Sequence, residues 1–217
     1  MPEQQIDTNQ STQLNWFQKI KSMPVDSTPK TILVAVTLCL VCSMIVASAA
    51  VNLRPMQDSN KLRDKQVNIL QVAGLYKDGI DVRKVFASFD PRIVEMKTGK
   101  FSDAFDAQTF DDRAAASDPE LSIQLQDDPA LIGRQSRYTT VYLLKNSNGS
   151  LDKVILPIYG YGLWSTLYGF IALEENGNDI FGLQFYEHAE TPGLGAEVDN
   201  PRWRKQWSGK KLRDENN

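Results

Sequence analysis

The chain has 217 residues, enough for one sizeable hydrophobic core with length left over for a membrane anchor. It carries 24 Lys and Arg against 27 Asp and Glu, and a net charge of −3 does not provide the basic surface that nucleic acid requires. Both cysteines lie in one apolar stretch, so the rest of the chain needs no disulfide and gives no sign of its redox compartment.

The first predicted element is a membrane-spanning helix over residues 31–53, which follows a polar segment over 1–30. The span contains 23 residues without a charge. As a helix it is about 34 Å long at ~1.5 Å per residue, enough for a hydrocarbon core of ~30 Å. A cleaved signal peptide is the alternative, because Ala47, Ser48 and Ala49 form a plausible cleavage site. The length of the apolar run and of the segment before it favours a retained anchor.

The charges around this span leave its orientation undecided. The basic residues near it are Lys19, Lys21 and Lys30 on the N-terminal side, and Arg54, Lys61, Arg63 and Lys65 on the other. The positive-inside rule therefore leans slightly towards a cytoplasmic C-terminal side.

The two cysteines, Cys39 and Cys42, form a C-x-x-C pattern inside the span. They share one helical face, and no second pair of ligands exists to close a metal site. We interpret both as small apolar residues and predict no metal centre.

Two helices are predicted after the span. The first covers residues 58–78 and ends at Gly79, and its apolar face consists of Leu62, Ile69, Leu70, Ala73 and Tyr76. Asp81 is the predicted N-cap of the second, over residues 82–89, and Pro91 is its predicted stop.

The next segment, residues 101–130, is strongly acidic. Arg113 is its only basic residue, and its eight acids are Asp103, Asp106, Asp111, Asp112, Asp118, Glu120, Asp127 and Asp128. A local charge of −7 argues against nucleic acid or an anionic membrane surface as its partner. We interpret it as a solvated and partly mobile insertion rich in Asp, Ala and Ser.

From residue 137 the pattern predicts an antiparallel meander. Runs of β-branched and aromatic residues cover 137–145, 152–159, 168–174 and 180–186. Turn sequences suited to hairpins separate the first two and the last two runs. The predicted fold class is therefore α+β, with an antiparallel sheet packed against the earlier helices.

A short helix is predicted to follow the sheet. Asp199 and Asn200 precede Pro201 in the favoured order of cap and proline, and Gly209 ends the helix. The tail over 202–213 is aromatic and basic, which could indicate nucleic acid. We prefer an amphipathic helix with two core tryptophans.

The most informative segment is 188–195, which reads His-Ala-Glu-Thr-Pro-Gly-Leu-Gly and holds the only histidine of the chain. Pro192 cannot continue the preceding strand, whereas Gly193 and Gly195 let a ligand approach the backbone N–H groups closely. Such a turn suits a phosphate or an electron-rich ring edge. On these residues alone, a tight turn with a solvated His188 and Glu190 is the alternative.

A second glycine-containing segment, 160–166, interrupts the strand region. It places four side chains at an end of the sheet: Leu163, Trp164, Ser165 and Thr166. They form a credible wall for a flat ring, although Trp164 by itself is more typical of a core position.

These segments resemble the FMN-binding domain in the C-subunit of the sodium-translocating NADH:quinone oxidoreductase, and in the related G-subunit of the electron transport complex. The resemblance runs through residues 159–169 and the H-x-E-T-P-G-L-G segment to Pro201, and includes the span and residues 65–74. It covers nearly the whole chain after about residue 14. The acidic segment and the Glu-Val-Asp-Asn-Pro continuation favour the C-subunit.

The resemblance implies an FMN site lined by Leu163, Trp164, Ser165, Thr166, His188, Glu190, Thr191, Pro192, Gly193, Leu194 and Gly195. It also implies a phosphoester between FMN and the threonine of an S-G-A-T-type motif. That motif is absent, and the nearest string is Ser208-Gly209-Lys210-Lys211. We therefore expect a C-terminally truncated family member with an incomplete FMN-binding domain.

The resemblance further implies a flavoprotein subunit that relays electrons during NADH oxidation by ubiquinone, coupled to sodium export. Its partners would be the other subunits and the bacterial inner membrane, with a cytoplasmic N-terminus and a periplasmic domain over 54–217. The chain shows no catalytic nucleophile and no complete active site of its own, since His188 and Glu190 are the only titratable pair near the site. The alternative from another class is an anchored, flavin-free interaction module.

Overall fold

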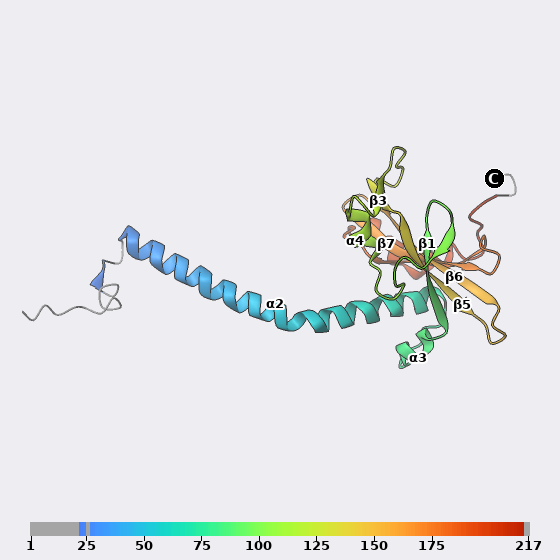
Figure 1. The fold of residues 1–217 in the computed structure, drawn as a ribbon, viewed down its shortest axis with the longest axis horizontal. Helices are drawn as coiled ribbons and strands as arrows, with labels where there is room; N and C mark the ends of the chain where they lie inside the picture. The colour runs from blue at the N-terminus through green and yellow to red at the C-terminus, as the bar shows by residue number, and fades with distance from the viewer. Residues whose placement is uncertain (1–21, 25–26, 215–217) are drawn as a thin grey trace, which may run out of the picture. The chain divides into compact units, whose positions relative to one another are not determined.

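The computed structural model describes residues 22–24 and 27–214, and the chain divides into two compact units, Met1–Asp58 and Ser59–Asn217. Most of the polar segment expected over residues 1–30 lies outside the described residues. An antiparallel sheet and its covering helices belong to the second unit (Figure 1).

The helix α2, Thr28–Val72, contains the predicted membrane span. Its most apolar stretch has a mean hydropathy of 2.6 and is not buried in the protein. Cys39 and Cys42 are free thiols exposed on its surface. Pro55 lies within the helix and removes one helical N–H donor just beyond the predicted span. By length and composition, α2 is a candidate membrane anchor.

A glycine ends α2 five residues earlier than predicted. The expected end was Gly79, but the helix closes at Gly74, whose φ is +73°. The Gly74 N–H donates to the Gln71 carbonyl at 3.0 Å, and the Leu75 N–H donates to the Leu70 carbonyl at 2.8 Å. These are the two bonds of a Schellman cap. Gly79 also has a positive φ, so glycine alone did not distinguish the helix end from the turn after it.

The helix α3, Val82–Phe86, confirms the predicted N-cap. The Asp81 side chain accepts a hydrogen bond from the Lys84 N–H at 3.3 Å. The helix is shorter than the predicted range of 82–89, because residue 89 already belongs to a strand.

That strand, β1 (Phe89–Glu95), corrects the role assigned to Pro91. Pro91 lies inside β1 and does not simply stop a helix. The neighbouring β2 (Lys100–Ser102) pairs only with residues 93–95, so Pro91 lies on a free stretch of the outer edge. A proline is tolerated on an edge because no neighbouring strand needs its missing N–H.

Six strands form the main sheet, in the order β2-β1-β5-β6-β7-β8, and all neighbours are antiparallel (Figure 1). The last four are β5 (Tyr138–Lys145), β6 (Leu151–Tyr161), β7 (Thr166–Glu174) and β8 (Ile180–Glu187). Each of their ends lies within two residues of the predicted one. The predicted meander and the α+β fold class are confirmed.

Each face of this sheet buries its own hydrophobic cluster. Successive residues of a strand point to opposite faces. Accordingly, Phe170 and Ala172 of β7 pack in the cluster that includes Ile69 and Leu70 at the end of α2. The other cluster comprises Ile171, Leu173, Ile180 and Leu183, with Trp203 and Trp207 packed against it.

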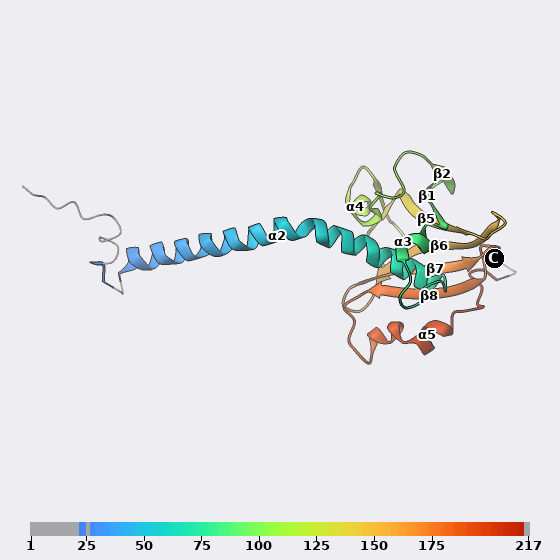
Figure 2. The ribbon, with the colours of Figure 1, turned by 90° about the horizontal axis from the view of Figure 1, so that it is seen from below.

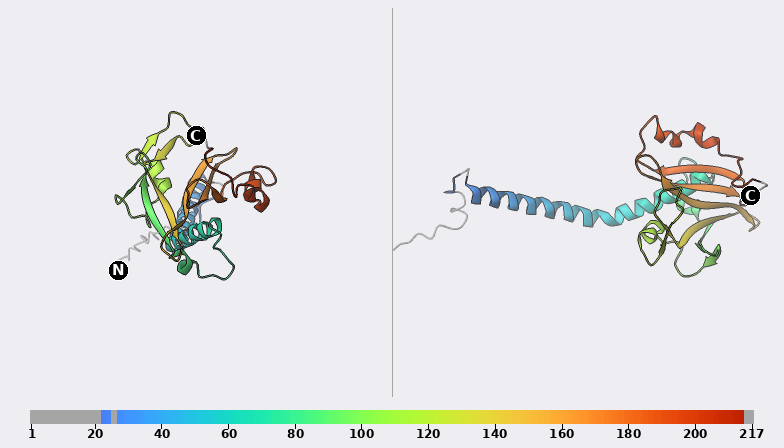
Figure 3. Two further views of the ribbon diagram at one scale, coloured as in Figure 1. Left: turned by 90° about the vertical axis from the view of Figure 1, so that its right-hand side faces the viewer. Right: turned by 90° about the horizontal axis from the view of Figure 1, so that it is seen from above.

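The two tryptophans belong to the predicted C-terminal helix and the turn after it. The helix is α5 (Pro201–Lys205), and it follows a 3₁₀ helix, η1 (Gly195–Asp199). The Asn200 side chain accepts from the Arg202 N–H at 2.9 Å, which confirms the cap-and-proline signal. Figures 2 and 3 show α5 and the end of α2 on opposite sides of the sheet.

The sheet opens between β5 and β6 towards one end. β5 pairs with β1 from Tyr138 to Leu144, but with β6 only from Tyr142 to Lys145. The helix α4 (Asp112–Ser117) packs on the unpaired part of β5, and the Asp112 carboxylate accepts from the Thr140 N–H at 3.1 Å. An aspartate thus replaces a strand as the acceptor for this N–H.

The acidic segment is more structured than its composition indicated. It supplies α4 and β3 (Ser122–Gln124), which pairs with β4 (Arg134–Ser136). Six of its eight acids are exposed, as expected, but five accept hydrogen bonds from backbone N–H groups: Asp106, Asp111, Asp112, Asp118 and Asp128. The run of acids therefore reflects turn and helix capping.

Burial raises the pKa of Asp112 to about 6, partly offset by Lys65. Its contribution to stability is fully present below the unfolded pKa of 3.8 and is lost as pH rises through about 6. We expect Asp112→Asn to raise the unfolding midpoint by roughly 2–4 °C at pH 8 and to have little effect at pH 4. Thermal unfolding followed by circular dichroism at both pH values measures this. A lower midpoint at pH 8 would show that the fold needs the charge.

Candidate functional site

Three loops meet at one end of the sheet. The hairpin loop 162–165 joins β6 to β7, and the segment 188–195 leaves β8. Pairing of Tyr168 with Glu187 places both at the same end. The loop 125–133, between β3 and β4, adjoins them because the Ala130 carbonyl accepts from the Tyr161 N–H at 2.7 Å. The structure therefore brings the two predicted segments together and adds a third.

Glu190 holds the first two loops against each other. Its side chain is buried, at 8% exposure, and one carboxylate oxygen accepts from the Trp164 N–H at 3.0 Å and the Ser165 N–H at 3.4 Å. A methyl group at Gly162 or at Gly195 would overlap the carboxylate. Both glycines are thus needed for close packing around Glu190. We call this arrangement the Glu190 clasp.

Two further contacts reinforce the Glu190 clasp. The Ser165 hydroxyl accepts from the Ala189 N–H at 2.7 Å. His188 Nδ1 lies 3.2 Å from the Glu190 N–H and accepts from it, while Nε2 lies 2.8 Å from an Asp199 carboxylate oxygen. Since Nδ1 accepts, a neutral ring carries its proton on Nε2 and donates it to Asp199. The polar groups of His188, Glu190 and Ser165 therefore bond within the protein.

The apolar side chains of the same loops are exposed. Leu163 is 77% exposed, Trp164 65% and Leu194 73%. Thr191 and Pro192 are also exposed, whereas Thr166 is half-buried as the first residue of β7. Exposed large apolar residues gathered at one place indicate a ligand or partner surface.

This surface offers the two kinds of group that a flavin nucleotide needs. The three exposed apolar side chains offer the flat contact that an isoalloxazine ring needs. The N–H groups of Thr191 and Gly193 donate to no other atom in the described part of the chain, so they remain as donors for a polar ring edge or a phosphate. Gly193 has a φ of +74°, and no atom lies within 4 Å of where its Cβ would be. The turn is therefore open towards a ligand.

Sequence reasoning missed two exposed residues at this end, Tyr161 and Leu131, at 50% and 68% exposure. Tyr161 lies in the predicted segment 160–166 but was not among the four side chains selected from it, and its place in the last pair before the hairpin loop is a signal that could have identified it. No pattern points to Leu131, because its proximity depends on the fold of the acidic segment.

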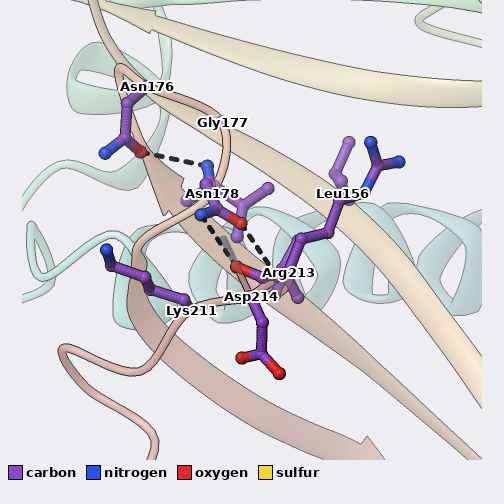
Figure 4. Close-up of a pocket in the computed structure, with 9 residues that line it drawn as sticks. Leu156, Asn176, Gly177, Asn178, Lys211, Arg213 and Asp214 are labelled. Atoms are coloured by element: carbon purple, nitrogen blue, oxygen red, sulfur yellow. Dashed lines mark hydrogen bonds between the residues drawn. The ribbon is translucent and has the colours of Figure 1, made fainter. Parts of the chain in front are cut away.

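A separate pocket lies at the opposite end of β7, and Figure 4 shows its lining. It is formed by Leu156, Leu173, Asn176, Gly177, Asn178, Lys211, Leu212, Arg213 and Asp214. The Asn178 side chain bonds to the backbone of Arg213 through both its nitrogen and its oxygen. None of the residues predicted for the FMN site lines this pocket.

An α+β domain with a glycine-rich end and an N-terminal candidate anchor is the architecture expected from the resemblance to FMN-binding domains. The family described as "FMN-binding domain" matches residues 162–217, which include both loops joined by the Glu190 clasp. The C-subunit of the Na(+)-translocating NADH-quinone reductase of Pseudomonas aeruginosa is 52% identical over 195 residues, which cover 87% of this chain and 74% of that protein. The C-subunit of Vibrio vulnificus is 50% identical over 194 residues, which cover 88% of this chain and 75% of that protein.

Solved structures agree with these relatives. The crystal structure of Shewanella oneidensis NqrC superimposes with a TM-score of 0.68 at 38% identity, covering 72% of this chain and 74% of that one. The crystal structure of the C-subunit from Parabacteroides distasonis superimposes with a TM-score of 0.58 at 27% identity, covering 74% of this chain and 70% of that one. The chain belongs to the NqrC family, the C-subunits of the Na(+)-translocating NADH-quinone reductase.

Proposed function

We propose that this protein is the FMN-carrying electron-relay subunit of a bacterial sodium-translocating NADH:quinone oxidoreductase. Its relatives of that name span most of the chain, and the described part contains one helix suited to a membrane anchor. In this proposal other subunits of the complex supply and remove the electrons on the route from NADH to ubiquinone, coupled to sodium export.

The observation that carries the proposal is the set of exposed apolar side chains at the end of the sheet. Leu163, Trp164 and Leu194 would contact the isoalloxazine ring, and the N–H groups of Thr191 and Gly193 would meet polar atoms of the nucleotide. FMN, when bound, supplies one- and two-electron transfer. The protein's part is to hold and orient it and to exclude water from the ring face.

The Glu190 clasp changes the roles proposed for the polar residues. Glu190, His188 and Ser165 bond to the protein itself, so we propose that they set the shape of the site without touching the ring. This arrangement requires no proton transfer by the protein, which suits an electron relay.

The S-G-A-T-type motif implied by the family resemblance is not among these 217 residues. The proposal therefore concerns non-covalent contacts of the two loops, and the chain can be tested with added FMN.

We propose that the anchor lies in the inner membrane with residues 54–217 on the periplasmic side. The orientation is supported by the family resemblance and not by the flanking charges. Reporter fusions after Arg54 test it, and activity of a cytoplasm-only reporter at that position would overturn it.

The test of FMN binding is titration of the purified chain with FMN, followed by quenching of flavin and tryptophan fluorescence. We expect saturable quenching, and we expect Trp164→Ala to weaken the affinity roughly tenfold through loss of ring stacking. Because Trp164 is 65% exposed, the unfolding midpoint should stay within a few degrees. Trp164→Phe keeps an aromatic ring and should recover most of the affinity. No saturable quenching by the unsubstituted chain would favour a flavin-free docking module.

A further inference from the structure

Leu131 has a backbone conformation that leucine rarely adopts. Its φ is +53°, and it is the one non-glycine residue with a positive φ in the part of the chain that the structure describes. In this region the Cβ of an L-residue crowds the neighbouring carbonyl oxygen, and leucine has no polar side chain to compensate. Such an outlier persists only where the surrounding structure holds it.

Asp128 holds Leu131 in this conformation. The Asp128 carbonyl accepts from the Leu131 N–H at 3.1 Å. Its carboxylate accepts from the Ile132 N–H at 3.1 Å and from the Gly133 N–H at 2.6 Å. One aspartate therefore closes the turn around Leu131 from both sides.

The side chain of Leu131 is not buried, although its backbone is strained. Leu131 is 68% exposed, so the fold gains little from its side chain. It is also next to the candidate site, since the Ala130 carbonyl accepts from the N–H of Tyr161, one residue before the hairpin loop. The Ala130 Cβ lies within 3.7 Å of the position that a Cβ on Gly160 would occupy, so the two backbones are packed together.

We infer that Leu131 is a further apolar contact for the isoalloxazine ring of FMN, held in place by Asp128. This inference rests on the proposed function. Four of the five exposed apolar residues at this end come from three separate loops and the fifth, Tyr161, ends β6: Leu131, Tyr161, Leu163, Trp164 and Leu194. Apolar side chains from three loops that meet at one end of the sheet can contact a flat ring from more than one side, which a single exposed loop cannot do.

The negative charges near Leu131 favour contact of this residue with the ring of FMN over contact with its phosphate. Asp127 and Asp128 lie on the same loop and repel a phosphate, so the neutral ring is the part that can approach. The same two charges disfavour insertion of this loop into an anionic membrane surface.

The test compares Leu131→Gly with Leu131→Ala in the purified chain, by FMN titration and by thermal unfolding. Both variants remove the apolar side chain, so both should weaken FMN binding by roughly fivefold. Glycine accepts a positive φ without strain, so Leu131→Gly should also raise the unfolding midpoint by roughly 2–4 °C. Leu131→Ala keeps the strain and should leave the midpoint within about a degree.

A matched control is Leu212→Ala, which removes a 49% exposed leucine at the other end of the sheet and should change neither quantity. A more stable Leu131→Gly variant with weaker FMN binding supports the inference, because a purely structural leucine cannot produce both effects. Unchanged FMN affinity in Leu131→Gly overturns it, and leaves the proposed function intact if the unsubstituted chain binds FMN. If the unsubstituted chain does not bind FMN, both are overturned.

Discussion

Glu190→Ala is expected to destabilise the domain and to disrupt the candidate site together. The substitution removes a buried carboxylate that accepts from the N–H groups of Trp164 and Ser165, and it leaves a space between Gly162 and Gly195. Hydrogen bonds to a charged group contribute about 1.5–3 kcal/mol each. Because the bond from Ser165 is long, at 3.4 Å, it should contribute less. We therefore expect a loss of roughly 2–4 kcal/mol and an unfolding midpoint lower by roughly 5–10 °C. FMN affinity should fall at least about tenfold, since the two loops would no longer be held together.

Two variants separate the Glu190 clasp from general effects of losing a glutamate. Glu190→Gln keeps an oxygen in the accepting position and should retain most of both the stability and the FMN affinity. Glu187→Ala removes an exposed glutamate whose ion pair with Arg113 is on the surface, and should change stability by less than about 1 kcal/mol. Circular dichroism melting and FMN titration are recorded for all three. An FMN affinity unchanged in a folded Glu190→Ala protein would show that the loops are positioned by something else.

Gly193→Val is expected to weaken FMN binding far more than Gly177→Val, although both should lower stability by a similar amount. The two glycines are matched in conformation, with φ of +74° and +67°, and neither has an atom within 4 Å of its missing Cβ. Strain from a positive φ, roughly 1–2 kcal/mol, therefore applies to both. They differ in place: Gly193 lies in the turn at the candidate site, and Gly177 lies in the β7–β8 turn at the other end of the sheet.

The measurement is the FMN affinity of each variant relative to the unsubstituted chain. Thermal unfolding is recorded for both variants, to check that their midpoints are lowered by a similar amount. We expect Gly193→Val to bind FMN at least about tenfold more weakly, because a branched side chain would fill the open space before the Thr191 and Gly193 N–H groups. If Gly193→Val keeps full affinity while Gly177→Val loses it, the turn over residues 190–195 is not the binding turn.

The parts of the fold that could be predicted are those whose sequence signal is local. The strands β5 to β8 alternate in the expected way and are linked by short turns, so their ends were predicted to within two residues. The caps at Asp81 and Asn200 were likewise predictable, because a cap depends only on the next few residues.

The parts that could not be predicted depend on distant partners. β1 contains Asp90, Pro91 and Arg92, a poor strand signal by composition, and it forms because β5 supplies a partner more than forty residues away. The acidic segment was predicted to be a solvated insertion, because aspartates that cap turns and helices cannot be distinguished by sequence from aspartates that are only solvated. Only their hydrogen bonds distinguish them.

The proximity of the two loops at the candidate site could be predicted, but the contacts of their side chains could not. Glycines and a proline correctly indicated two loops that the structure brings together. The polar residues His188 and Glu190 were expected to line the ligand, yet their partners are Asp199 and the backbone of the neighbouring loop. A residue type shows that a group can form a hydrogen bond, but not which atom it bonds. That these loops bind FMN stays a prediction.

The pairing of β1 with β5 also sets an order of assembly during synthesis. Residues Phe89 and Leu144 pair at one end and Glu95 and Tyr138 at the other, so β1 leaves the ribosome 43 to 55 residues before its partner. At about 5–20 residues per second this is a wait of roughly 2–11 s. An unpaired strand is exposed to wrong partners during that time, and a proline and two charges are the residues that natural strands use to discourage such pairing. The proline and charges that make β1 a poor strand signal are thus well suited to a strand that stays unpaired until β5 is synthesised.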